Sequence, residues 1–111
     1  MRLVIRITLY ADQRLEISGE AATADEAFEL ARELQPDLIV LDHYIEGPVM
    51  GLEAAPKMKS GAPDAKILLF ASHDLSTEAS REPAIDGYLQ KNNIRQLLPT
   101  VQRMLGIDIA A

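Results

Sequence analysis

Two short runs of apolar residues constrain the fold of this chain more than any other feature. Residues 38–41 (LIVL) and residues 67–70 (ILLF) are apolar at every position, whereas the segments around them mix charged and apolar residues. A strand that is buried on both faces of a sheet has this pattern, because its side chains point alternately to two covered faces. The two runs therefore predict buried parallel strands, and we expect residues 38–41 to form a central one.

Segments with helical spacing accompany these predicted strands. Thr23 and Glu26 form a capping box, with a hydroxyl at the N-cap and a carboxylate three residues later, and Pro36 stops the helix that follows. The remaining predicted elements are helices at about 52–60 and 75–82, a strand at 87–90, and a helix that Asn93 caps and Gly106 ends. Strands that alternate with helices in this way predict an α/β domain with a parallel sheet.

Residues 1–18 have a different pattern. Apolar residues occupy every second position over residues 3–9, several of them β-branched, and Leu15 and Ile17 continue the alternation. A period of two is typical of strands, so residues 1–18 are predicted to form a β-hairpin. A helix over residues 3–11 is the alternative, although the β-branched side chains give it a poor helix propensity.

The length and charge describe one acidic domain. The chain has 111 residues and a mass of 12.2 kDa, which predicts a single domain over residues 1–111 with a loosely held tail at residues 107–111. There are 11 basic and 17 acidic residues, so the net charge is −6. This balance argues against a nucleic-acid-binding surface and against a polybasic membrane anchor.

Cysteine usage and hydropathy suggest a compartment. The chain has no cysteine, which excludes disulfides, thiolate nucleophiles and cysteine–zinc sites and fits a reducing cytoplasm. The sequence shows no signal-peptide pattern and no apolar run of the roughly 18 residues that a membrane span needs. We therefore expect a cytoplasmic protein that has no membrane partner.

An acidic residue follows the first apolar run directly. Asp42 comes immediately after residues 38–41, and Lys91 comes immediately after the predicted strand at 87–90. In open α/β sheets, ligands bind beyond the carboxyl ends of the strands. The sequence therefore predicts a site at this edge of the sheet, with Asp42 in it.

Four segments resemble a known family in their order and spacing. They are residues 36–42 (PDLIVLD), 51–53 (GLE), 65–70 (AKILLF) and 86–91 (DGYLQK). From Gly19 to Leu105 the chain resembles the receiver domain of bacterial two-component response regulators. The resemblance implies a flavodoxin-like, three-layer α/β/α fold with a mostly parallel five-strand sheet, to which an antiparallel hairpin strand at the N-terminus would be an addition.

The resemblance also implies roles for single residues. In the family, an Asp at the end of the third strand accepts a phosphoryl group from a histidine kinase, and Asp42 occupies that position. Lys91 matches a lysine that contacts the phosphoryl group, and Tyr88 matches an aromatic switch position. The family's Thr or Ser after the fourth strand falls on Ala71, which leaves Ser72, one place later, as the candidate phosphate contact.

The chain departs from the family at its beginning. The family starts with a strand that ends in two acidic residues, which hold Mg²⁺ together with the phosphoacceptor, but no acidic pair precedes Asp12. A Mg²⁺ site is therefore weakened, and no other cofactor is predicted. In the family this strand lies between the second and third strands, so without it two strand edges would keep unpaired backbone groups. Residues 2–10 could occupy that place as an antiparallel strand, which would bring Arg2 near Asp42. Alternatively, two copies of the chain could pair as a homodimer.

Three functional hypotheses stay open at this point. The leading one is a receiver-like domain in phosphorelay signal transduction, with a histidine kinase or another signalling protein as its partner. The alternative is a degenerate receiver that acts as a phosphorylation-independent interaction or dimerisation module, in which Asp42 and Lys91 form a structural ion pair. A third hypothesis is a small-ligand binder at the same strand-end cleft.

Enzyme and metal-site readings find little support. His43 and His73 each follow a predicted strand, but two isolated histidines are most often loop residues, so no metal site is predicted. Haloacid dehalogenase-type phosphatases need a second Asp two residues after the first, where this chain has Tyr44. Phosphate-loop, dinucleotide and nucleophile-elbow motifs do not occur. We therefore predict no catalytic residue and no enzyme.

Overall fold

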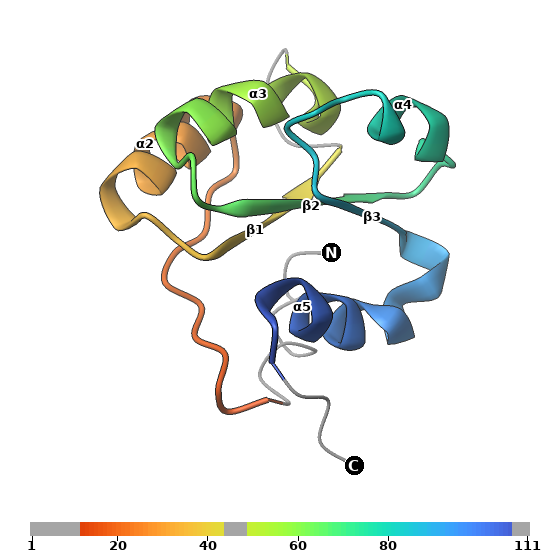
Figure 1. The fold of residues 1–111 in the computed structure, drawn as a ribbon. Helices are drawn as coiled ribbons and strands as arrows, with labels where there is room; N and C mark the ends of the chain where they lie inside the picture. The colour runs from red at the N-terminus through yellow and green to blue at the C-terminus, as the bar shows by residue number, and fades with distance from the viewer. Residues whose placement is uncertain (1–11, 44–48, 108–111) are drawn as a thin grey trace.

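The computed structural model describes residues 12–43 and 49–107, which Figure 1 draws in colour. Three parallel strands form one sheet in the order β1-β2-β3. The strands are β1 (Leu38–Asp42), β2 (Lys66–Ala71) and β3 (Gly87–Gln90). The helices are α2 (Ala24–Leu34), α3 (Gly51–Gly61), α4 (Ser76–Ser80), the 3₁₀ helix η1 (Lys91–Gln96) and α5 (Leu97–Leu105).

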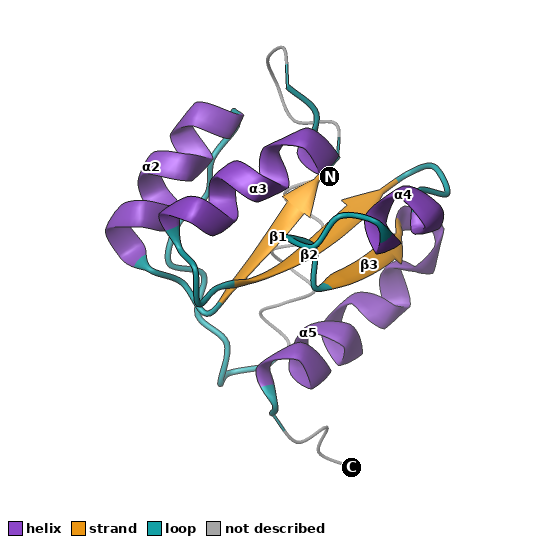
Figure 2. Ribbon diagram, turned by 45° about the horizontal axis from the view of Figure 1, so that its top comes forward, coloured by secondary structure: helices purple, strands orange, loops and turns teal. Residues whose placement is uncertain are grey.

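The helices cover both faces of this sheet. Helices α2, α3 and α4 lie on one face, and α5 lies on the other (Figure 1). The three strands point in the same direction, so their carboxyl ends share one edge (Figure 2). The predicted class, an α/β fold with three layers and a parallel sheet, is confirmed, and three of the five implied strands lie in the described part of the chain.

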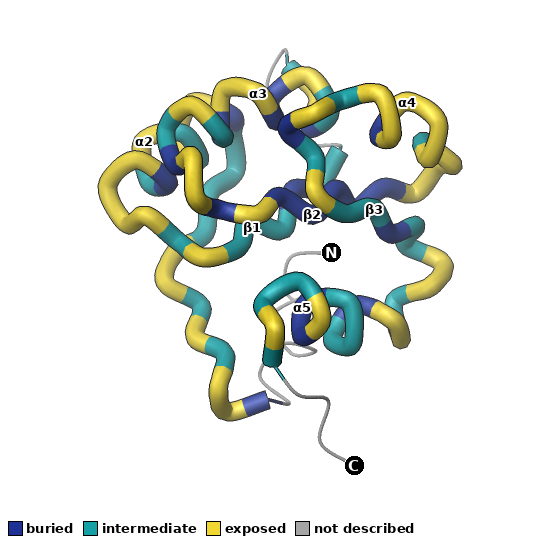
Figure 3. Tube along the Cα trace, viewed as in Figure 1, coloured by how far each residue is buried: buried dark blue, intermediate teal, exposed yellow. Residues whose placement is uncertain are grey.

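Strand β2, rather than β1, is the central strand of the described sheet. Residues 67–71 of β2 are 0% exposed, whereas only Leu41 is buried in β1 (Figure 3). The difference arises because β2 has a strand on each side, while β1 has β2 on one side only among the described strands. A strand on the other side of β1 would involve residues outside the described ranges, so the expectation that residues 38–41 form a central strand stays a prediction.

The apolar run of β2 serves two cores. Ile67 and Leu69 pack in the cluster that includes Met58 of α3, and Leu68 and Phe70 pack in the cluster that includes Leu97 and Val101 of α5. Alternate side chains of a strand point to opposite faces, so each face of β2 receives apolar residues. Burial on both faces explains why no polar residue interrupts the run, as the sequence pattern predicted.

Most helix ends follow their sequence signals. The Thr23 hydroxyl accepts a hydrogen bond from the Glu26 amide at 3.2 Å, which confirms the predicted N-cap of α2. Gly106 ends α5 in a left-handed conformation with φ of 70°, as expected for a glycine just after a helix. Asn93 is a correction: it lies inside η1 with a non-helical φ of −107°, and α5 begins later, after Gln96. The chain first forms the 3₁₀ helix η1 after β3, so the α-helix begins only at Leu97.

The segment before α2 differs from its prediction. Residues 1–11, the larger part of the predicted hairpin, lie outside the described residues, as do residues 108–111 of the predicted tail. The second predicted strand, around Leu15 and Ile17, is not formed, because residues 15–22 carry no strand pairing. Side-chain contacts hold the start of this segment to α5 instead: the Gln102 amide donates to the Asp12 carboxylate at 2.8 Å.

Asp12 is a buried carboxylate with several donors. The Arg14 guanidinium donates to both of its oxygens, at 3.0 and 2.8 Å, and the Arg14 backbone N–H donates at 2.9 Å. These hydrogen bonds, with that from Gln102, hold the pKa of Asp12 far below its ordinary value. The cluster fastens the segment before α2 to the helix at the far end of the chain.

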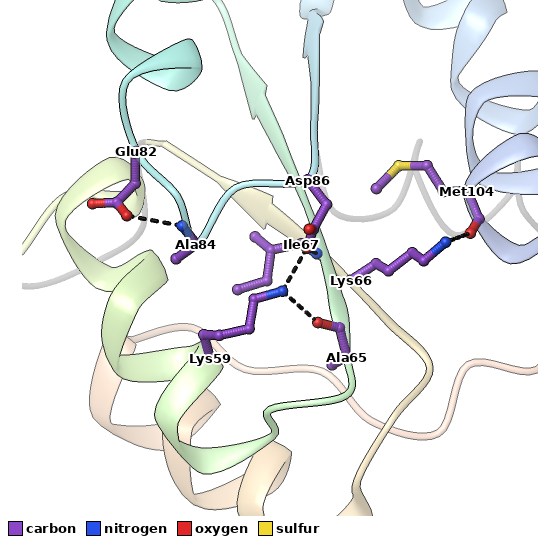
Figure 4. Close-up of polar contacts among 8 residues, drawn as sticks. All are labelled: Lys59, Ala65, Lys66, Ile67, Glu82, Ala84, Asp86 and Met104. Atoms are coloured by element: carbon purple, nitrogen blue, oxygen red, sulfur yellow. Dashed lines mark hydrogen bonds and ion pairs between the residues drawn. The ribbon is translucent and has the colours of Figure 1, made fainter.

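A second carboxylate fastens the amino end of β2. Asp86 accepts hydrogen bonds from the Ile67 backbone N–H at 2.9 Å and from Lys59 Nζ at 2.5 Å, and Lys59 also donates to the Ala65 carbonyl at 2.8 Å (Figure 4). Burial raises the pKa of Asp86, but the hydrogen bonds from Lys59 and Ile67 outweigh it and lower the pKa below its ordinary value. The end of α3, the start of β2 and the segment before β3 are thereby joined.

Candidate functional site

The carboxyl ends of β1 and β3 bring a carboxylate and an ammonium group together. Asp42 is the last residue of β1, and Lys91 directly follows β3. Lys91 Nζ lies 2.8 Å from Asp42 Oδ2, and the side chains are 15% and 26% exposed. The lysine reaches across the end of β2, where Nζ lies 5.8 Å from the centre of the Phe70 ring. An accessible carboxylate with a cation beside it can act as a nucleophile toward an electrophilic phosphorus.

The N-terminus of α3 packs directly against the end of β1. The Gly51 amide donates to the His43 carbonyl at 2.7 Å, and the Leu52 amide donates to His43 Nδ1 at 3.3 Å. A Cβ atom at Gly51 would lie 2.5 Å from the Asp42 carbonyl oxygen, so only glycine permits this approach. The helix end therefore helps to position the backbone of Asp42.

The capping role of His43 was missed in the sequence. Nothing in the spacing of nine residues between His43 and Leu52 signals a side-chain cap, because the loop between them decides whether the two can meet. His43 Nδ1 accepts a backbone N–H here, which requires that nitrogen to be unprotonated. His73 lies on another loop, so the two histidines serve different segments.

Tyr88 is tied to the loop after β2. Its hydroxyl donates to the His73 carbonyl at 2.7 Å and accepts from the Leu75 amide at 2.9 Å. The ring is partly buried in the cluster that contains Ile67 and Leu69. Tyr88 therefore holds the segment that leads into α4, and it does not take part in the Asp42–Lys91 pair.

Ser72 is exposed, and its hydrogen bonds do not involve Asp42 or Lys91. Its hydroxyl lies 3.4 Å from His73 Nδ1, and its carbonyl lies 3.5 Å from the Gln90 side-chain amide. Ala71, which precedes it, is fully buried. Of the four predicted site residues, the structure thus brings Asp42 and Lys91 together, while Tyr88 and Ser72 belong to the loop that follows β2.

The described residues do not form a ready magnesium site. Mg²⁺ requires octahedral oxygen ligands and is commonly held by one or two carboxylates with water or phosphate oxygens. Asp42 is engaged with an ammonium group, and within residues 12–43 and 49–107 no group of three or more His, Cys, Asp or Glu residues is placed to hold a metal ion.

The fold and the charged pair define a class of protein. A parallel three-layer α/β/α domain with a carboxylate and a lysine at the carboxyl edge of its strands is a flavodoxin-like domain of the receiver type. The family model described as "Response regulator receiver domain" matches residues 1–102. The chain belongs to this family, whose members work in two-component signalling.

Curated and solved relatives agree with this assignment. The chain is 33% identical over 93 residues to the response regulator protein VraR of Staphylococcus aureus, a match over 82% of this chain and 44% of VraR. It is 28% identical to a LuxR-family two-component response regulator from Aurantimonas, with a TM-score of 0.76 over 91% of this chain and 75% of that one. The response regulator domain of Thermotoga maritima CheB shares the fold, at 22% identity and a TM-score of 0.78 over 97% and 90% of the two chains.

Two further findings concern the extent of the chain and its helices. The chain spans less than half the length of the curated relatives that it matches. No helix in the described ranges has the length and apolar character needed to cross a membrane.

Proposed function

We propose that this receiver domain accepts a phosphoryl group on Asp42 from a histidine kinase. The observation that carries the proposal is the 2.8 Å contact between Lys91 Nζ and Asp42 Oδ2 at the carboxyl edge of the sheet. Phosphoryl transfer needs a positioned nucleophile and positive charge near the oxygens of the transferred group, and these two side chains supply both.

The chemistry follows from the pair. A carboxylate oxygen of Asp42 attacks the phosphorus of a phosphohistidine in line with the phosphorus–nitrogen bond. The oxygen–phosphorus bond forms as the phosphorus–nitrogen bond breaks, and the leaving imidazole nitrogen takes a proton from solvent. Lys91 lies close enough to exchange its contact with Asp42 for one with a phosphoryl oxygen, which keeps its charge at the site. Ser72 would contact a phosphoryl oxygen, and Tyr88 would act as the switch residue through the loop after β2, to which its hydroxyl is bonded at His73 and Leu75.

The second candidate function is a degenerate receiver that binds partners without phosphorylation. The buried Ala71 favours it, because the family has a hydroxyl at this position, and so does the absence of a carboxylate cluster among the described residues. In that case the Asp42–Lys91 pair is structural, and a signalling protein or a second copy is the partner. Both functions place the domain in the cytoplasm.

Intact-mass measurement after incubation with acetyl phosphate separates the two. We expect the wild-type chain to gain one phosphoryl group, with and without added Mg²⁺ as two arms of the experiment, and the Asp42→Asn variant to gain none. Asp25→Asn is the matched control, because Asp25 also pairs with a lysine, Lys57 at 2.7 Å, but is 90% exposed on α2. No adduct on a folded wild-type chain in either arm would select the degenerate receiver.

A further inference from the structure

His43 joins the end of β1 to two other elements. Its backbone N–H donates to the Phe70 carbonyl of β2 at 3.1 Å, which extends the parallel ladder one residue past Asp42. Its carbonyl accepts a hydrogen bond from the Gly51 amide at 2.7 Å, and its ring nitrogen Nδ1 accepts one from the Leu52 amide at 3.3 Å. The residue directly after the candidate phosphoacceptor therefore makes three hydrogen bonds, to β2 and to α3.

Helix α3 receives its side-chain cap from His43 and not from its own N-cap residue. Met50 stands at the N-cap, and its side chain makes no capping hydrogen bond. The first N–H groups of a helix have no acceptor inside the helix. The first two of α3, those of Gly51 and Leu52, both donate to His43. The cap comes from the end of a strand and ties the start of the helix to that strand.

Helix α2 has a local cap, which makes a useful comparison. Thr23 directly precedes α2, and its hydroxyl accepts a hydrogen bond from the Glu26 amide at 3.2 Å. Helices α2 and α3 have 11 residues each. The two caps are therefore matched in kind, but the cap of α2 lies within four consecutive residues, whereas the cap of α3 reaches back to the end of β1.

The cap of α3 acts on the backbone that carries the carboxylate. At Gly51 the helix approaches so closely that a Cβ atom would lie 2.5 Å from the Asp42 carbonyl oxygen and 2.7 Å from the His43 Cα atom. Together with the hydrogen bonds of His43, this packing holds the peptide after Asp42 between β2 and α3. The direction of that backbone sets where the Asp42 side chain points, which is toward Lys91 Nζ at 2.8 Å.

We propose that His43 is a positioning residue for phosphoryl transfer: by capping α3 through Nδ1, it holds the Asp42 carboxylate in line with the phosphoryl donor. The inference rests on the proposed function and names a residue that sets the geometry of the acceptor. Phosphoryl transfer depends almost entirely on positioning and electrostatics, and a misplacement of about 1 Å can slow a reaction on the order of 100-fold. His43 acts through the backbone, so its removal should cost part of such a factor.

The test compares two substitutions at position 43. His43→Ala removes the acceptor of the Leu52 N–H and keeps the backbone hydrogen bonds. His43→Asn restores an acceptor, because its Oδ1 atom is bonded to Cγ as Nδ1 is in histidine, and asparagine is a good capping residue. Initial rates of labelling by acetyl phosphate are followed by intact mass. We expect His43→Ala to be labelled roughly five- to thirtyfold more slowly than the wild type, and His43→Asn within about threefold of it.

Thr23→Ala is the matched control, because it removes the side-chain cap of the other 11-residue helix. We expect Thr23→Ala and His43→Ala to lower the urea midpoint to a similar extent, since each loses one cap. Labelling of Asp42 should stay within about twofold of the wild type in Thr23→Ala. If Thr23→Ala slowed labelling as much as His43→Ala, the effect would come from stability in general. That result, or an Asn variant as slow as the Ala variant, would contradict the positioning role.

Amide hydrogen exchange followed by NMR separates a failure of this inference from a failure of the proposed function. The Leu52 amide should exchange several-fold faster in His43→Ala than in the wild type, and His43→Asn should restore its protection. A wild-type chain that gains no phosphoryl group while its Leu52 amide is protected would overturn the proposed function, and this inference with it. A wild-type chain that is labelled, but no faster than His43→Ala, would overturn this inference alone.

Discussion

The two ends of the sheet each carry a lysine–aspartate pair, and the pairs are built differently. At the amino end, Asp86 also binds the Ile67 backbone N–H, and Lys59 also binds the Ala65 carbonyl. At the carboxyl end, Lys91 and Asp42 join two strand ends by their side chains, across β2. A pair that is tied to the backbone on both sides stabilises the fold, whereas a pair between two side chains can be exchanged for another ligand. The comparison suggests a structural end and a functional end of one sheet.

The largest expected effect is at the structural end. Asp86→Ala should lower the free energy of unfolding by roughly 2–3 kcal/mol, because it leaves the Ile67 N–H without its acceptor and Lys59 without its counter-charge. Urea unfolding followed by circular dichroism measures the change. Asp86→Asn keeps an acceptor for the Ile67 N–H and should cost less than Asp86→Ala. Equal losses would show that the charge alone matters.

The next-largest effect is expected at Gly51, where the start of α3 packs against the end of β1. Gly51→Ala should lower the free energy of unfolding by about 2 kcal/mol, because the new methyl group would overlap the Asp42 carbonyl and push α3 away. It should also reduce acetyl phosphate labelling of Asp42. Gly106→Ala is the matched control: a Cβ there has nothing within 4 Å, so its cost comes from the positive φ alone, about 1 kcal/mol. If Gly51→Ala changed neither the free energy of unfolding nor the labelling of Asp42, then α3 would not position Asp42.

A smaller effect is expected from pH. The pKa of Asp86 is lowered in the folded state, so its contribution to stability is fully present above the ordinary value of 3.8 and is lost as the pH falls through the folded pKa. The stability difference between the wild type and Asp86→Asn should therefore narrow below about pH 3.8. Urea midpoints measured at pH 7 and pH 3 give the two differences. A stability difference that is larger at pH 3 than at pH 7 would mean that folding raises the pKa of Asp86 instead of lowering it.

The smallest effect on stability is expected at Lys91. Lys91→Met should change the free energy of unfolding by about 1 kcal/mol, because Lys91 Nζ makes one hydrogen bond, to a side chain that water still reaches, whereas Lys59 Nζ bonds both a carboxylate and a backbone carbonyl. The same change should strongly reduce phosphoryl labelling of Asp42. Lys59→Met is the matched variant and should show the opposite pattern, a larger loss of stability with labelling retained. If both variants behaved alike, the distinction between the two ends of the sheet would fail.

Much of this architecture could be read from the sequence. The apolar run of β2, the Thr23 cap of α2 and the left-handed Gly106 are local signals, and each appears in the structure as expected. The start of α5 could not be read in this way, because Asn93 looks like a cap until the turn after β3 is known. Local patterns fail where the geometry of a neighbouring element sets the boundary.

The candidate site likewise has some features that the sequence predicts and others that depend on the tertiary structure. The positions of Asp42 and Lys91 at strand ends followed from the order of strands, because parallel strands end at one edge. The contact of His43 with α3, the tie between Tyr88 and the loop after β2, and the bonding of Ser72 away from the charged pair involve residues whose distances depend on loop paths. No spacing rule predicts such contacts.

The sequence by itself determined the class of fold, the family and the carboxylate at the edge of the sheet, because periodicity and motif order are properties of the chain alone. Tertiary structure decided that β2 lies between β1 and β3 in the described sheet, that Asp86 fastens the amino end, and that Lys91 reaches Asp42 across the end of β2. These outcomes depend on which strands are neighbours and on what covers their edges. Such relations join residues far apart in the chain, and only packing settles them.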